Sequence, residues 1–208
     1  MTRTIAFLYD NHDDAVAAVR DLERQFAHDA ISIVANTGSA DRLRRTTDGD
    51  TASDTASGVG TGAGIGAAVG GGAGLLAGLG MLAIPGIGPV VAAGWLAATL
   101  AGAAAGAGVG AVSGGIIEAM TGAGVSTEDA HLYAEGVRRG GTLVVARVDE
   151  GQVSLAESIM RQHNPVDSTA RRTAFRETGW KAFDPNAAAY EGTSDRPEEA
   201  PLRRTRTR

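Results

Sequence analysis

The chain has 208 residues, a formal net charge of −5 and no cysteine. The lack of cysteine excludes disulfides, thiolate metal sites and cysteine nucleophiles, and the negative charge provides no basic field for a nucleic-acid partner. The length fits one small domain with an insertion.

Residues 1–36 are predicted to form the first half of an α/β head. Residues 4–9 have the composition of a strand, and Asn11 and Asp14 have the spacing of a helix-capping box. Apolar residues then recur at helical intervals, and residues 31–35 predict a second strand. Because the chain runs directly into a strand without an apolar leader, we expect no signal peptide.

A polar linker over residues 37–57 precedes a stretch that carries no charge between Asp54 and Glu118. Glycine recurs in this stretch with a period of four, which on a helix keeps a narrow face open to another backbone. Such a pattern is a glycine zipper. The predicted helix-packing positions are Gly58, Gly62, Gly66, Gly70, Gly74 and Gly78 in the first run and Gly94, Gly102, Gly106, Gly110 and Gly114 in the second, where Ala98 keeps the spacing.

The zipper, residues 58–115, is predicted to be a helical hairpin with arms at 58–83 and 90–115. At about 1.5 Å per residue each arm could cross a hydrocarbon core of about 30 Å. Its bulkiest apolar residues lie near the turn, so we expect the tip either to insert into membrane lipid or to be the buried end of an oligomer. A flexible glycine-rich linker is a further alternative. The predicted turn residues are Pro85, Gly86, Gly88 and Pro89.

Residues 116–167 are predicted to complete the head. Residues 126–139 and 154–163 predict helices, residues 142–148 predict a strand, and a short strand is expected around Val166. Without the insertion, this order is that of a ferredoxin-like split βαβ fold, in which an antiparallel sheet carries two helices on one face. The predicted fold class is therefore α+β, with a ferredoxin-like head interrupted by the zipper hairpin.

The C-terminal residues 168–208 are predicted to be a basic and aromatic tail that is largely disordered. One part has the spacing of a short amphipathic segment that could dock on an acidic protein partner or on an anionic membrane surface. Incidental aromatic residues in a disordered tail are the alternative. The candidate docking residues are Arg172, Phe175, Arg176, Trp180 and Phe183.

Catalytic, cofactor and metal sites are not expected. Residues 62–67 and 106–111 formally match a dinucleotide-binding fingerprint, but neither stretch follows a predicted strand. The polar residues 10–14 are interpreted as a helix cap rather than a cation site, because acidic residues at a helix start are stabilised by the helix dipole.

Several segments resemble the YflT-like general stress protein domain family. They are residues 4–10, 14–22 and 31–36, and, as in its glycine-zipper members, a helix over 128–141 followed by a strand over 142–145. The resemblance covers roughly residues 3–167. It implies a stress-associated bacterial protein and supplies no catalytic residue.

The expected function is therefore that of a non-enzymatic stress protein whose hairpin anchors in or on the bacterial inner membrane and self-associates. Arginines flank the zipper on both sides, which places the head and termini in the cytoplasm. Two alternatives remain: a soluble homo-oligomeric regulatory or ligand-binding module with the hairpin as its assembly core, and a small pore or permeabilising protein.

Overall fold

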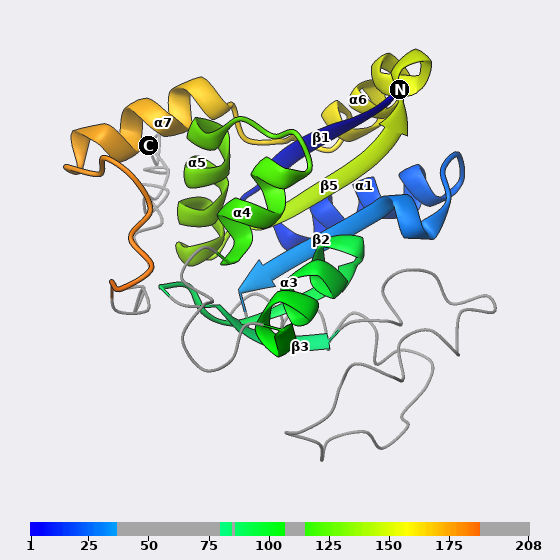
Figure 1. Ribbon diagram of the computed structural model, residues 1–208. Coiled ribbons are helices and arrows are strands. Elements are labelled where there is room, and N and C mark those ends of the chain that lie inside the picture. Colours follow the sequence, from blue (N-terminus) through cyan, green and yellow to red (C-terminus); the bar gives the residue numbers. More distant parts are fainter. Residues whose placement is uncertain (37–79, 85, 107–114, 188–208) are drawn as a thin grey trace, which may run out of the picture.

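The computed structural model describes residues 1–36, 80–84, 86–106 and 115–187, with no description of the side chains of residues 81 and 103–106. These residues form an α+β fold in which a five-stranded antiparallel sheet carries six helices (Figure 1). The α+β class predicted from the sequence is thus confirmed.

The sheet has the strand order β1-β5-β2-β4-β3. Its strands are β1 Thr2–Tyr9, β2 Ile31–Asn36, β3 Gly80–Ile84, β4 Gly88–Gly94 and β5 Thr142–Asp149. Strand β5 lies between β1 and β2 and is antiparallel to both, so that Ala146 is opposite Ile5 on one side and Ile31 on the other. Strands β1 and β2 are therefore parallel to each other, and the chain between them crosses one face of the sheet.

Helices cover both faces of the sheet. Helices α1 His12–Glu23 and α6 Val153–Arg161 cover one face, and α3 Trp95–Gly106, α4 Gly115–Gly122 and α5 Thr127–Arg138 cover the other. Each face of the sheet has its own hydrophobic core: the first core lies under α1 and α6, and the second core lies under α3, α4 and α5. Val144 and Ala146 of β5 pack in the first core, whereas Leu143 and Val145 pack in the second. A strand buried on both faces explains why the sequence of β5 is apolar almost throughout.

Two 3₁₀ helices and helix α7 complete the elements of the described residues. The 3₁₀ helices His28–Ala30 and Glu150–Gln152 precede β2 and α6, and helix α7 spans Ser168–Glu177. Asn11 caps α1, since its Oδ1 accepts a hydrogen bond of 3.1 Å from the backbone N–H of Asp13. This geometry supports interpreting residues 10–14 as a helix start.

The helical prediction for residues 80–83 and 90–94 is wrong, because these residues belong to strands β3 and β4. Gly86, Gly88 and Gly94 have φ angles of 76°, 92° and 87°, which no continuous helix contains. Strand β4 pairs with β2, with Ala93 opposite Ile33, so these backbone groups gain sheet hydrogen bonds. Pairing with a distant strand outweighs the local glycine period.

Of the apolar residues expected near the tip of a membrane hairpin, those whose side chains the structure describes pack in or against the core of the head, and residues 75–79 lie outside the described residues. Ile84, Val90, Leu96 and Leu100 are at most 6% exposed. The turn between β3 and β4 contains Gly86, and Pro85 lies outside the described residues. Gly58 to Gly78, Gly110 and Gly114 also lie outside them.

Two expectations for the second half differ from the structure. Around Val166 there is no strand, only a backbone hydrogen bond of 2.7 Å from its N–H to the carbonyl of Leu8. Asn164, with φ 52°, and Pro165 turn the chain away from an extended path. Residues 168–187, expected to be largely disordered, form α7 and a following ordered segment, and 188–208 lie outside the described residues.

Within the part of the chain that the structure describes, no helix combines the length and apolar character needed to cross a membrane.

Candidate functional site

The strongest candidate site is the surface on which the C-terminal segment docks. Residues 168–187, called the strap from here on, begin with α7 beside α5 (Figure 1). Asp167 caps α7, since its Oδ1 accepts hydrogen bonds of 2.8 and 3.0 Å from Thr169 and Ala170. After the helix, the backbone N–H of Trp180 donates a hydrogen bond of 3.1 Å to the backbone carbonyl of Phe175.

Three arginines of α7 form ion pairs with carboxylates of the head. Arg171 lies 2.5 Å from Asp10 at the end of β1. Arg172 contacts Asp129 at 2.6 Å and Glu128 at 3.1 Å, and Arg176 contacts Glu128 at 3.0 Å. These last two carboxylates lie in the first turn of α5, where the helix dipole also stabilises negative charge.

Two buried phenylalanines, Phe175 and Phe183, anchor the strap by apolar contacts, and Trp180 packs on the first of them. Phe175 is 5% exposed, and the guanidinium of Arg139 lies 4.3 Å from its ring centroid. The ring of Trp180 packs edge-on against Phe175 at 5.7 Å. Phe183 enters the second core, and its backbone N–H donates to Nδ1 of His131 at 3.2 Å.

The strap contacts one face of α5, called its outer face, through Glu128 in the first turn and Arg139 just after the end of the helix. Glu128, Leu132, Glu135 and Arg139 recur at helical intervals on this face, and Leu132 and Glu135 are each 1% exposed. Glu135 pairs with Arg138 at 3.3 Å and Arg139 at 2.6 Å. The inner face, with Ala130, Tyr133, Ala134 and Val137, packs on the sheet core. Helix α5 is therefore buried on two opposite sides.

The end of the strap lies on the β3–β4 turn. A Cβ atom added to Gly86 would lie 2.6 Å from the backbone oxygen of Asp184 and 2.7 Å from Cα of Pro185. The strap thus spans the head from Asp10 to Gly86.

The five candidate docking residues, Arg172, Phe175, Arg176, Trp180 and Phe183, all lie in the strap. The surface that receives them is on the same chain and was not predicted from the sequence. The acidic first turn of α5 was the available signal, but a helix cap accounted for it equally well.

The zipper glycines that the structure describes lie in two different elements, strand β4 and helix α3. Gly94 ends β4, and a Cβ there would collide with Ile31 O and Ser32 Oγ. Gly102 lies on the exposed side of α3, with no atom of the described residues within 4 Å of a Cβ built on it. Gly106 is the last residue of α3.

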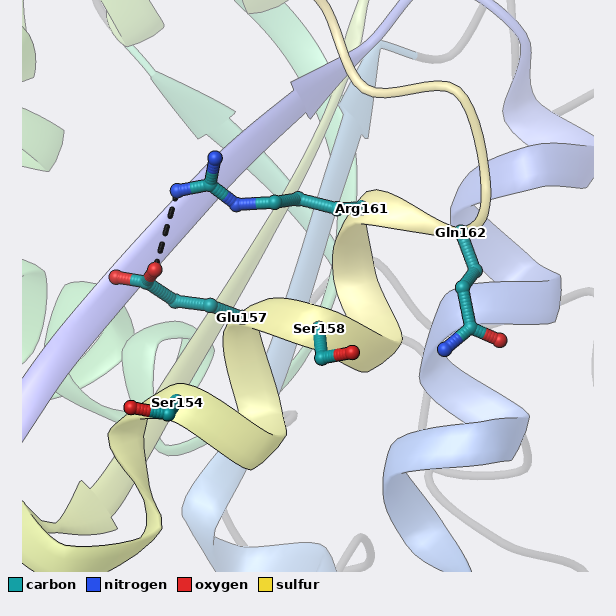
Figure 2. A pocket seen from close by; sticks show the side chains of 5 residues that line it. All are labelled: Ser154, Glu157, Ser158, Arg161 and Gln162. Atoms are coloured by element: carbon teal, nitrogen blue, oxygen red, sulfur yellow. Dashed lines mark hydrogen bonds and ion pairs between the residues drawn. The ribbon is translucent and has the colours of Figure 1, made fainter.

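A surface hollow on α6 is a weaker candidate site. Figure 2 shows this hollow, lined by Ser154, Glu157, Ser158, Arg161 and Gln162, in which Arg161 and Glu157 pair at 3.1 Å. All of these groups come from the end or the surface of one helix. Among the described residues, no cluster of His, Asp and Glu could hold a metal ion.

No protein-family model, curated protein or solved structure matches this chain.

Proposed function

We propose that this chain is a non-enzymatic, stress-associated bacterial protein that self-associates through its glycine zipper, which a ferredoxin-like head carries. The observation that supports the self-association is the outward face of α3. Ala98, Thr99 and Gly102 are exposed on this face, and the whole helix contains no charged residue.

The two sides of α3 differ in a way that suits helix packing. Leu96 and Leu100 are buried on the inner side, which fixes the helix to the sheet. On the outer side the hydroxyl of Thr99 donates back to the carbonyl of Trp95 at 2.9 Å. A second helix could therefore approach this small, uncharged face closely.

The other parts of the proposal have separate support. The order of β1, β5 and β2, with α1 and α6 on one face, favours the ferredoxin-like description. The stress association rests on the resemblance in sequence. Membrane association at the cytoplasmic side of the inner membrane is assigned to residues 58–79, since residues 84–100 supply their large apolar side chains to the head.

This last observation also favours the second candidate function, a soluble homo-oligomeric module assembled through the zipper. The two candidates share the contact at Gly102 and differ in the role of residues 58–79.

Substitution of Gly102 tests the shared contact. Gly102→Leu adds a bulky side chain to the open face of α3, so we expect the protein to self-associate at least about tenfold more weakly in sedimentation. Gly102→Ala is the matched control and keeps the face narrow. Unchanged self-association of the leucine variant, in buffer and in detergent, would refute the zipper contact.

A carbonate wash separates the two candidates. The full chain is compared with a variant that lacks residues 58–79, which removes none of the described strands. Retention on membranes that depends on these residues supports the membrane protein, and release of both proteins as defined oligomers supports the soluble module.

A further inference from the structure

The strap is held by contacts that do not depend on its covalent connection to the head. Each ion pair joins α7 to a residue distant in sequence: Arg171 to Asp10, Arg172 to Asp129 and Arg176 to Glu128. Both aromatic anchors likewise enter surfaces made by other elements. A strap from a second copy of the chain would find the same partners in the same places.

We propose that the outer face of α5 is an interaction surface for the strap of a second copy, so that two copies exchange straps and each completes the other's surface. The charge and shape of this surface identify the segment that binds it. The surface offers Asp10 and Glu128 as carboxylates that are 63% and 60% exposed, with buried Leu132 between the ends of α5. A helix with arginines and a phenylalanine at the spacing of Arg171, Phe175 and Arg176 matches this surface.

The connection between α6 and α7 suits such an exchange. Residues 162–167 join helices that end at Arg161 and begin at Ser168. This hinge contains Asn164 in the left-handed region and Pro165. In the described chain the backbone hydrogen bond from Val166 to Leu8 ties it to the sheet, His163 pairs with Asp21 of α1 at 3.0 Å, and Val166 packs against the second core. Short hinges that hold the chain in a sharp turn favour the swapping of a terminal element between copies.

The balance between the closed form and the exchanged form depends on the local concentration of the protein. The strap contacts are the same within one chain and between two, so they cancel in the comparison. The closed form is favoured by the millimolar effective concentration that a short tether gives. The exchanged form is favoured by opening of the hinge and by high local concentration. Exchange does not require the zipper contact, although that contact would bring copies together.

Charge reversal tests the exchange with full chains. One variant carries Asp10→Arg and Glu128→Arg on the surface, and the other carries Arg171→Glu and Arg176→Glu on the strap. Each variant repels its own strap. In the mixed dimer one interface is the native one and the other is its charge-reversed counterpart, so both are complementary. A chain with all four substitutions is the matched control, because its strap fits its own surface again.

The expected result is an excess of mixed dimers. One variant is isotope-labelled, and native mass spectrometry measures the proportion of mixed to like dimers in an equal mixture. We expect the mixed form to exceed random pairing by about tenfold, as several weak surface pairs change from repulsive to attractive. High salt should remove the excess.

Random pairing, or no pairing, between variants with native circular dichroism would overturn the proposal. The zipper contact joins like and unlike variants equally, so on its own it gives random pairing and cannot produce an excess of mixed dimers. If either double variant does not fold, the single changes Glu128→Arg and Arg176→Glu give the same comparison, because these side chains are 60% and 61% exposed.

Discussion

Gly86 lies directly beneath Asp184, and there is no room for a side chain between them. A Cβ atom on Gly86 would be 2.6 Å from the backbone oxygen of Asp184 and 3.0 Å from the ring of Phe183. The glycine also has φ 76°, a conformation that L side chains rarely adopt. The turn of the β3–β4 hairpin is therefore shaped to receive the strap.

Gly86→Ala should destabilise the protein by about 1–3 kcal/mol, because it adds both a strained φ angle and a collision with the strap. Urea unfolding measures the change. Gly124→Ala is the matched control, since Gly124 has φ 94° but nothing within 4 Å of its added Cβ. Equal losses in the two variants would mean that the strap does not rest on Gly86 in solution.

Alanine at Gly94 and at Gly102 should have opposite effects. Gly94→Ala forces a Cβ into Ile31 O and Ser32 Oγ at the corner between β4 and α3, so we expect a loss of more than about 2 kcal/mol. Gly102→Ala fills open space within a helix and should stabilise by up to about 1 kcal/mol. Thermal unfolding compares them. A gain in stability from both would instead indicate the continuous helical arm that the glycine period predicts.

The sequence predicted the elements whose patterns are local. The helical face of Ala15, Val19 and Leu22 is buried in α1, and the apolar run at 142–148 is β5. The strands β3 and β4 were missed because β4 pairs with β2, more than fifty residues earlier in the chain, and β3 pairs in turn with β4. A glycine period of four is compatible with a helix, but it contains no information about that distant partner.

The candidate site was predicted on one side only. Arg172, Phe175 and Arg176 have the spacing of a short amphipathic docking segment, and in the structure they lie on helix α7. The acceptor was not predictable, because Glu128 and Asp129 become a binding surface only when the fold brings α5 beside α7. The burial of Leu132 on the outer face of α5 was not predictable either, since a helix on a sheet normally exposes that face.

Glu135→Gln should destabilise the protein by about 1–3 kcal/mol. Glu135 is 1% exposed and forms ion pairs with two arginines, so the neutral amide removes both charged contacts in a partly buried place. Glu157→Gln is the control, because the exposed pair of Glu157 and Arg161 on α6 should be worth less than about 0.5 kcal/mol. Guanidinium unfolding distinguishes them, and a Glu135→Gln loss no larger than the control would show that the ion pairs of Glu135 add no more stability than an exposed pair.

The protein should lose stability above about pH 10, the ordinary pKa of tyrosine. Burial, with a smaller contribution from Asp14, raises the pKa of Tyr9 well above that value, and burial also raises the pKa of Tyr133. Below pH 10 both folded and unfolded chains keep these protons, and the full stability is present. Above it only the unfolded chain loses them, so the free energy of unfolding should fall by up to about 1.4 kcal/mol per pH unit for each tyrosine.

Tyr9→Phe tests the alkaline loss at one residue. The Tyr9 hydroxyl donates to the carbonyl of Met160 at 2.9 Å, so the variant should lose about 1 kcal/mol at neutral pH. Between pH 10 and 12 its stability should then fall less steeply than that of the parent, because one titrating group has gone. Tyr133→Phe should change the slope in the same direction. Urea unfolding at several alkaline pH values measures both, and parallel slopes for Tyr9→Phe and the parent would show that Tyr9 titrates normally in the folded protein.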